Sequence, residues 1–149
     1  MHPFMGDISK DISSKFINQK VKALINIKYT ANWLHSKEVD YFKPYGISPQ
    51  QYNILRILRG AAAPIKVQLI KERMIERAPN ATRLMDKLCD KNFIGRTRSD
   101  HDRRVVYIHI TKIGLQLLDE ISINIDLDFM NNLNEEEAAL LSGLLDKIR

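Results

Sequence analysis

Residues 77–111 change their hydrophobic period partway along, and this change limits the folds that the chain can adopt. The first part has apolar residues at the spacing of one helix side, at Ala81, Leu84, Met85 and Leu88. Residues 105–110 alternate instead, with Val106, Ile108 and Ile110 facing one side of a strand. The sequence therefore predicts a short helix followed by a two-stranded ribbon.

Charge gathers on the outer side of this helix and in the loop of the ribbon. Projected at about 100° per residue, the helix side away from the core carries Arg83, Asp86, Lys87 and Asp90. The ribbon loop carries Ser99, Asp100, His101, Asp102, Arg103 and Arg104. A helix joined to a basic hairpin is a shape suited to DNA, with the helix in the major groove and the hairpin beside it.

Length and composition indicate one globular domain of 149 residues, 44% of them hydrophobic and 28% charged. The formal net charge of +5 weakly favours a polyanionic partner. The single cysteine, Cys89, excludes an internal disulfide and fits a reducing compartment. We expect a cytoplasmic protein, because residues 1–11 do not resemble a secretory signal and no apolar run approaches the roughly 20 residues of a membrane span.

The segment before the ribbon predicts a helix-turn-helix. Ser48 is placed as an N-cap, Pro49 as the first helical residue and Gln51 as the partner in a capping box, and Gly60 is placed to end this helix. A second short helix follows with Val67, Leu69, Ile70 and Met74. Pro79 suits the first turn of the third helix.

The two ends of the chain predict long helices whose apolar sides need another partner. Residues 8–35 have the spacing of one amphipathic helix, on the order of 40 Å long. After Thr111, which is placed as a cap, a helix is expected with Ile113, Leu117, Leu118, Ile121, Ile125 and Phe129 on its apolar side. Asn134 and Glu137 mark a second capping box, before a stripe of Ala138, Leu141, Leu144, Leu145 and Ile148. Since these helices exceed what a small DNA-binding module can cover, the simplest partner is a second subunit.

Three segments carry motifs in a fixed order. Residues 48–58 read SPQQYNILRIL, residues 80–88 read NATRLMDKL, and residues 102–104 read DRR before ITKIG at 110–114. Through these segments the chain resembles the MarR family of winged-helix transcriptional regulators, with its second helix, its recognition helix, its Asp-x-Arg wing and the Leu-Thr-x-x-Gly that follows. Asn92 replaces the family's usual glycine, and asparagine tolerates the left-handed conformation better than most residues. Ile110 replaces the usual leucine.

The resemblance implies a mainly α (α+β) fold, a winged helix-turn-helix with long N- and C-terminal helices forming a dimerisation platform. The whole of residues 1–149 would be one domain, with residues 48–111 as the DNA-binding lobe and residues 8–42 and 112–149 as the platform. It also implies a homodimer on a pseudo-palindromic operator, acting as a repressor, although activation uses the same contacts.

Within the recognition helix, Arg83 is the best candidate for a base contact, because a guanidinium can pair with guanine O6 and N7. Asn80 and Thr82, near the helix N-terminus, can donate to phosphate or to a base edge. Lys87 suits a phosphate. The alternative is that Arg83 only pairs with Asp86 or Asp90 on a solvated surface.

In the wing, Arg104 matches the family's arginine that enters the minor groove, with Asp102 orienting it through a charge-assisted pair. Arg103 and Arg98 would follow phosphates, and His101 at the tip is expected in water. The alternative is an ordinary charged hairpin turn.

A small aromatic or anionic effector is a further expectation from the family, bound between the dimerisation helices and the winged helix. The candidate lining residues are Trp33, His35, Tyr41, Tyr45 and Tyr52, all of which would serve equally as core or interface. Cys89 lies on the recognition helix and is expected to be small and half-buried, not a peroxide sensor.

Two rival classes of function remain beside DNA binding. An enzyme is not expected, because no glycine-rich phosphate loop is present and the four histidines are scattered. Likewise we expect no cofactor and no metal, although His35 and Glu38 share a helical side and stay open as part of a regulatory metal site. The other rival is a winged helix that contacts proteins without binding DNA, and the arginine-rich wing argues against it.

Overall fold

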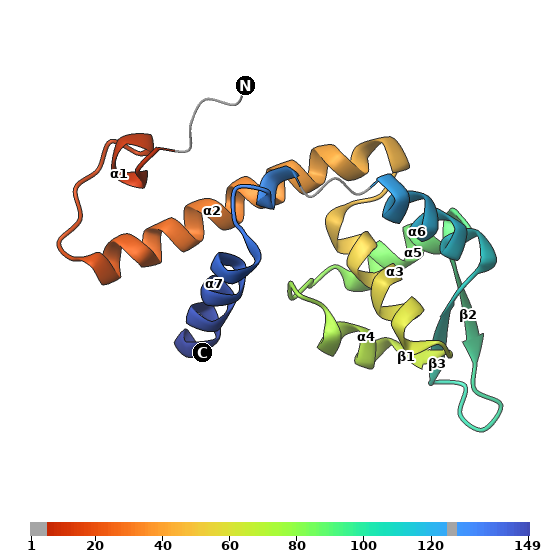
Figure 1. The fold of residues 1–149 in the computed structure, drawn as a ribbon. Helices are drawn as coiled ribbons and strands as arrows, with labels where there is room; N and C mark the ends of the chain where they lie inside the picture. Colours follow the sequence, from red (N-terminus) through yellow and green to blue (C-terminus); the bar gives the residue numbers. More distant parts are fainter. Residues whose placement is uncertain (1–5, 125–127) are drawn as a thin grey trace. The chain divides into compact units, whose positions relative to one another are not determined.

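Figure 1 shows the computed structural model of the chain, which describes residues 6–124 and 128–149. The chain divides into two compact units, Met1–Tyr41 and Phe42–Arg149. The first unit holds α1 (Ile8–Asp11) and all of α2 (Gln19–Phe42) except its last residue, Phe42. The second holds η1 (Lys43–Tyr45), α3 (Pro49–Ala61), β1 (Ile65–Lys66), α4 (Val67–Arg73), α5 (Ala81–Asp90), β2 (Ile94–Arg98), β3 (Val106–Ile110), α6 (Lys112–Asn124), η2 (Asp128–Met130) and α7 (Glu135–Ile148).

The single helix expected over residues 8–35 is wrong in its N-terminal part. Asp7 caps the short α1, and Ser13 then takes a left-handed φ of 51°, which breaks the helix. The next helix begins where the Asn18 side chain accepts a hydrogen bond from the Val21 N–H at 2.9 Å, and it continues to Phe42. Local polar side chains offer the backbone an alternative to helix here. Hydrophobic spacing does not depend on those side chains, so it continues across the break.

The start of α3 follows the prediction, but its end does not. Ser48 Oγ accepts from the Gln51 N–H at 3.1 Å, and Gln51 Oε1 accepts from the Ser48 N–H at 2.9 Å, which completes the capping box. The helix passes through Gly60 to Ala61, and Ala62 takes the left-handed cap conformation with φ 54°. Gly60 is therefore a helical residue and not the cap.

Of the three helices predicted before the ribbon, the second is α4 and the third is α5. The Ala81 N–H donates to the Ala78 carbonyl at 3.0 Å, which closes a turn with Pro79 in its second position. Proline favours this position because its ring fixes φ near the value that the turn requires. The helix begins only at Ala81, so the expectation that Pro79 lies in its first turn is wrong.

The ribbon is part of a three-stranded antiparallel sheet in the order β1-β3-β2. The strands β2 and β3 pair as expected, with Arg96 opposite Ile108 and Gly95 opposite His109. The strand β1 was not predicted from the sequence, and it pairs Ile65 with Ile108 across the other edge of β3. The result is the winged helix-turn-helix expected from the sequence.

One hydrophobic core joins α3, α4, α5, α6 and the sheet. Its fully buried side chains come from all of these elements: Ile54, Leu55, Leu58, Ile70, Met85, Leu88, Ile108, Leu118 and Ile121. Burying such side chains is worth about 1.5–3 kcal/mol each before the entropy of ordering is counted. The core therefore fixes the orientation of α5 relative to the ribbon.

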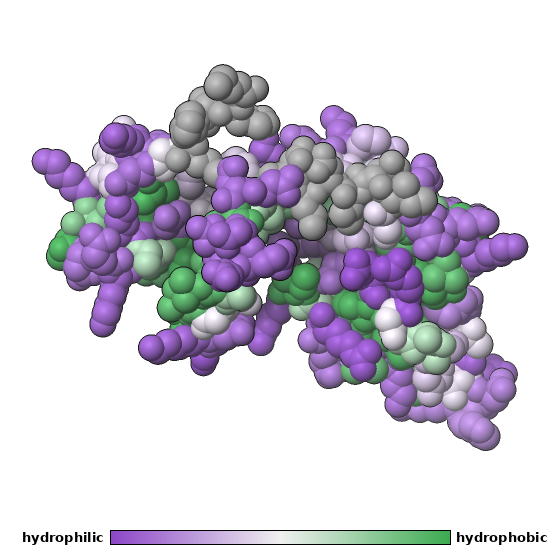
Figure 2. Space-filling view, in the orientation of Figure 1, coloured by the Kyte–Doolittle hydropathy of each residue, from purple (hydrophilic) through white to green (hydrophobic). Residues whose placement is uncertain are grey.

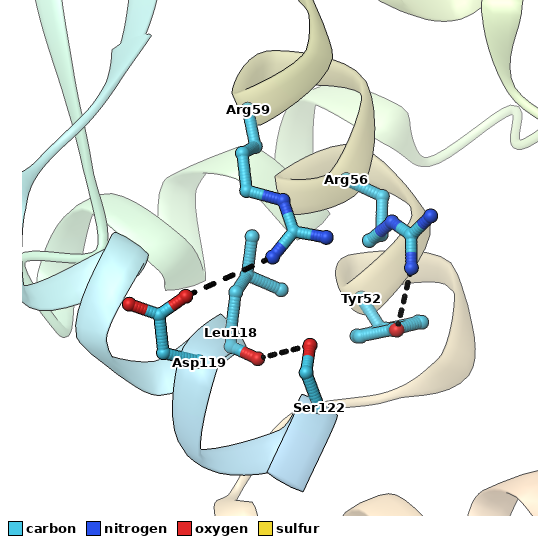
Figure 3. Close-up of polar contacts among 6 residues, drawn as sticks. All are labelled: Tyr52, Arg56, Arg59, Leu118, Asp119 and Ser122. Atoms are coloured by element: carbon cyan, nitrogen blue, oxygen red, sulfur yellow. Dashed lines mark hydrogen bonds and ion pairs between the residues drawn. The ribbon is translucent and has the colours of Figure 1, made fainter. Parts of the chain in front are cut away.

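Polar contacts also lie where α3 meets α6 (Figure 3). Arg59 of α3 approaches the Asp119 carboxylate of α6 at 4.0 Å. Within α6, the Ser122 hydroxyl donates to the Leu118 carbonyl at 2.7 Å. These contacts lie at the edge of the core and add little stability of their own.

The helix α6 is shorter than predicted. Its start agrees, because Thr111 Oγ1 accepts from the Gly114 N–H at 3.1 Å. It ends at Asn124, Ile125 lies outside the described residues, and Phe129 belongs to the short η2. The predicted capping box of α7 is present, with Asn134 Oδ1 accepting from the Glu137 N–H at 2.9 Å.

The apolar stripe of α7 lies at the surface. Leu140, Leu141, Leu144 and Ile148 are all exposed, and Figure 2 shows hydrophobic colour reaching the surface over this helix. Among the described residues, no helix has both the length and the apolar character needed to cross a membrane.

Candidate nucleic-acid interface

The helix α5 presents one buried and one charged side, as the sequence predicted. Ala81, Leu84, Met85 and Leu88 are buried, whereas Arg83, Asp86, Lys87 and Asp90 are exposed. The buried side is anchored to α3, where the Gln51 amide donates to the Leu84 carbonyl at 3.3 Å. A rigid attachment of this kind is what a helix needs to hold its outer side chains in a fixed register.

The link before α5 is tied to α3 as well. The Ile75 N–H donates to Asn53 Oδ1 at 2.9 Å, and the Gln50 amide donates to Glu76 Oε2 at 3.1 Å. These bonds tie the chain to α3 at positions five and six residues before Ala81. The N-terminus of α5, with Asn80 and Thr82 both exposed, is therefore held from both sides.

The turn between α5 and β2 is locked by Thr111. Asn92 has the left-handed φ of 60° that was expected where the family usually has glycine. The Thr111 hydroxyl donates to the Asn92 carbonyl at 2.6 Å, while its backbone N–H donates to the Phe93 carbonyl at 3.0 Å. Gly114 lies against the same carbonyl, and an added Cβ there would lie only 2.2 Å from the Phe93 oxygen. The Thr-x-x-Gly motif thus clamps the start of α6 onto this turn.

The loop of the wing is shaped by Ser99 and Asp102. The Ser99 Oγ accepts from the His101 N–H at 3.2 Å, and the Val105 N–H donates to the Asp102 carbonyl at 2.9 Å. The Asp102 carboxylate accepts from the backbone N–H of Arg104 at 3.0 Å. The expected ion pair with the Arg104 guanidinium is not formed among the described residues, so Asp102 orients Arg104 through the backbone.

An ion pair joins α5 to the ribbon. The Arg96 guanidinium of β2 donates to the Asp86 carboxylate, and this hydrogen bond is the main cause that raises the pKa of Arg96 above its ordinary value. Because Asp86 is paired with Arg96, it does not serve as the partner of Arg83. Neither Asp86 nor Arg96 was among the site residues expected from the sequence.

The remaining cations of this surface are exposed on α5 and on the wing: Arg83, Lys87, Arg98, Arg103 and Arg104. Within residues 6–124 and 128–149, none of the five has a carboxylate partner. The wing loop extends beyond the body of the lobe, and its end is hydrophilic in the space-filling view (Figures 1 and 2). This surface can therefore accept anionic oxygens without first breaking an internal pair.

Comparison with known proteins gives the same assignment. A profile of the MarR family matches residues 47–106. The regulator YkoM of Bacillus subtilis is 34% identical over 79 residues, and the chain spans about half of its length (51%). A MarR transcription factor from Planctomyces limnophilus is 30% identical, with 90% of this chain and 98% of that chain covered at a TM-score of 0.69.

The chain belongs to the MarR family. A mutant MarR from Escherichia coli, crystallised with operator DNA, shares the fold at a TM-score of 0.75, with 23% identity, 90% of this chain and 99% of that chain covered. The members of this family are transcriptional regulators, and the structure of this chain has the family's winged helix.

The effector residues proposed for this MarR-family chain come from both units. Trp33, His35 and Tyr41 lie on α2, whereas Tyr45 lies in η1 and Tyr52 in α3. The Tyr52 ring stacks on Phe42 with centroids 4.4 Å apart, and its hydroxyl accepts from Arg56 Nη1 at 3.2 Å (Figure 3). An effector pocket remains a prediction.

Two further features of the side chains bear on the alternatives. Cys89 is half-buried as expected, and burial raises the pKa of its thiol, so it is not an activated nucleophile. Among the described residues, no three His, Cys, Asp or Glu side chains gather in a way that could hold a metal ion.

Sequence reasoning missed the residues that position this MarR-family surface. The pair of Asp86 and Arg96 joins positions ten residues apart, and the contact of Gln51 with Leu84 spans 33. The charges were visible in the sequence, but which charge meets which depends on how β2 packs against α5. The close approach of Gly114 to Phe93 had one signal, the glycine of the Thr-x-x-Gly motif.

Proposed function

We propose that this protein is a sequence-specific DNA-binding regulator that binds a pseudo-palindromic operator as a homodimer. The observation that carries the proposal is the set of five exposed cations on α5 and the wing that have no carboxylate partner among the residues that the structure describes. Exposed cations beside a rigidly held helix N-terminus match the chemistry of a duplex backbone and its base edges. The E. coli MarR protein crystallised with operator DNA supports the same function for this fold.

The major-groove contacts would come from α5. Arg83 is exposed, and its potential partner Asp86 is engaged elsewhere, which favours the base contact over a solvated ion pair. A guanidinium can donate two hydrogen bonds to guanine O6 and N7. Asn80 and Thr82 lie at the helix N-terminus, where backbone and side-chain donors suit phosphate, and Lys87 would contact a phosphate farther along.

The wing would bind the adjacent minor groove. Asp102 holds the backbone N–H of Arg104, which sets the direction in which this residue leaves the loop. A narrow minor groove concentrates negative potential and favours an inserted arginine. Arg98 and Arg103 would neutralise phosphates on either side.

Dimerisation would use the terminal helices. The stripe of Leu140, Leu141, Leu144 and Ile148 on α7 is exposed, as are Leu24, Ile27 and Val39 on α2. Apolar helix sides of this length are unfavourable in water and are commonly covered by a second subunit. A two-fold dimer presents two α5 helices to half-sites about one helical turn apart.

Repression would follow if the bound dimer covers DNA that polymerase needs. A small aromatic or anionic ligand at Trp33, His35, Tyr41, Tyr45 and Tyr52 would release it. Repression and release by a ligand both extend the proposal. They can be tested once the protein has been shown to bind the upstream duplex.

Fluorescence anisotropy of the purified protein tests the proposal, with DNA from upstream of its own gene and a scrambled duplex over a salt series. We expect tight binding to the upstream duplex, much weaker binding to the scrambled one, and affinity that falls steeply with salt as counterions are released. Sedimentation should give a dimer. Absence of binding even at low salt would instead favour a protein-contact role.

Replacing Arg104 by alanine separates DNA contact from dimerisation. Loss of a minor-groove arginine should weaken operator binding by on the order of 1–3 kcal/mol, while sedimentation still gives the dimer. His101→Ala in the same loop is the matched control and should bind like the wild type. A monomeric Arg104→Ala variant would contradict the assignment of contacts to separate parts of the chain.

A further inference from the structure

One side of β2 carries three residues with different roles along its length. Side chains alternate along a strand, so Ile94, Arg96 and Arg98 share one side. Ile94 is 2% exposed and belongs to the core, Arg96 pairs with Asp86, and Arg98 is exposed toward the loop. Along this side the strand passes from the core, through an ion pair, to an exposed arginine that has no carboxylate partner in the described part of the chain.

Asp86 occupies a central place on the outer side of α5. It lies three residues after Arg83 and directly before Lys87, the two cations proposed to contact DNA from this helix. Its carboxylate is directed at Arg96 and binds it through a charge-assisted hydrogen bond. A carboxylate at this position would otherwise repel the phosphates that Lys87 is expected to meet.

We infer that the Asp86–Arg96 pair sets the position of the wing relative to the recognition helix, so that Arg96 is a positioning residue and not a phosphate contact. This inference rests on the proposed DNA-binding function. The pair joins α5 to the middle residue of β2, which lies opposite Ile108 of β3 and two residues beyond the buried Ile94. Without it, Ile94 and Ile108 would still hold the ribbon to the core, but the outer side of β2 would lose its tie to α5 and the loop with Arg104 would move more freely.

The pair is suited to a role in positioning because it contributes little to folding. The side chains of Arg96 and Asp86 are 40% and 51% exposed, and ion pairs this exposed add little to stability. Variants of the pair should therefore fold, and their effect should appear in DNA binding. A displacement of the loop by about 1 Å is enough to disturb a directed contact.

Asp86→Asn tests the inference through the sign of its effect. The substitution removes a negative charge from a surface that binds a polyanion, so electrostatics alone predict tighter binding. Loss of positioning predicts weaker binding instead. The expected loss is roughly twofold or more, which corresponds to the lower end of the interaction energies between coupled residues. Asp90→Asn, one turn along α5, removes the same charge without breaking this pair and should bind like the wild type or more tightly.

Arg96→Gln separates positioning from phosphate contact. A phosphate ligand would contribute about 0.9 to the slope of log affinity against log salt, so its loss would lower that slope. The inference predicts weaker operator binding with the slope unchanged. The double variant Asp86→Asn/Arg96→Gln should bind no more weakly than Arg96→Gln alone, because the pair acts as one unit.

A cycle with Arg104→Ala excludes a merely structural effect. If the wing is already displaced in Asp86→Asn, the further cost of Arg104→Ala should be at least roughly twofold smaller than in the wild type. Thermal melting of each variant should match the wild type. Equal binding by Asp86→Asn and Asp90→Asn, or a cost of Arg104→Ala that is the same in both backgrounds, would overturn the inference. Failure of the wild type to distinguish operator from scrambled DNA would instead overturn the proposed function.

Discussion

Replacing Gly114 by alanine measures how tightly α6 is clamped onto the turn between the recognition helix and the wing. An alanine Cβ would lie 2.2 Å from the Phe93 carbonyl oxygen and 2.8 Å from Ile110 Cγ1. The Phe93 carbonyl has little freedom to retreat, because it accepts from the backbone N–H of Thr111 at 3.0 Å and lies 3.1 Å from the hydroxyl oxygen of the same residue. The backbone must therefore shift at the junction.

Two opposing terms give the expected magnitude. Overpacking typically costs about 1–3 kcal/mol of stability. We expect a cost of about 3 kcal/mol here, because the close contact is with backbone and not with a flexible side chain. Alanine recovers about 1 kcal/mol of helix propensity, which leaves a net loss of about 2 kcal/mol. For a chain of this size each kcal/mol shifts Tm by roughly 2–4 °C, so Gly114→Ala should melt about 4–8 °C below the wild type.

Gly60→Ala is the matched control, because Gly60 is also helical and, apart from its chain neighbours and its own helix backbone, no atom of the described residues lies within 4 Å of a Cβ added there. This variant should gain up to about 1 kcal/mol from propensity alone and melt slightly above the wild type. Circular dichroism melts at one protein concentration give both values, since dissociation of a dimer would shift Tm with concentration. If the Tm of Gly114→Ala equals that of Gly60→Ala, at or above the Tm of the wild type, the steric argument is refuted.

Three other substitutions or reactions test separate parts of the structure. Leu144→Glu places a charge in the exposed stripe of α7 and should shift sedimentation toward the monomer, whereas Ser142→Glu on the same helix should not. Asn92→Ala should lower stability by roughly 1–2 kcal/mol in thermal melts because alanine resists the left-handed φ of 60°, while Asn92→Gly should not. Because burial raises the pKa of Cys89, its thiolate fraction at pH 8 is smaller than that of free cysteine, and iodoacetamide should alkylate it more slowly in native protein than in urea. Equal rates followed by mass spectrometry would contradict that environment.

The features that sequence predicted correctly are local. The capping boxes of Ser48 with Gln51 and of Asn134 with Glu137 join residues three positions apart, so their bonds form wherever the helix begins. The change from helical spacing to alternation at residues 81–110 likewise reflects which side of each element faces the core. Motifs in a fixed order then sufficed to indicate the family.

The features that sequence missed depend on backbone geometry or on distant residues. Hydrophobic spacing continues through Ser13, where the helix breaks, and it cannot register the competing polar caps. Glycine marked a helix end at position 60, but the chain turns at Ala62. The strand β1 has two residues and exists only because Ile65 pairs with Ile108, 43 positions away.

Side-chain type and short spacing were enough to indicate most of the helices and strands, the side that each turns to the core, and the supply of cations for a DNA-binding surface. Tertiary structure alone decided which of those cations are free. Packing of β2 against α5 brings Arg96 to Asp86 and leaves Arg83, Arg98 and Arg104 without a carboxylate among the described residues. A charge acts through its distance from other charges, and only the folded chain sets that distance.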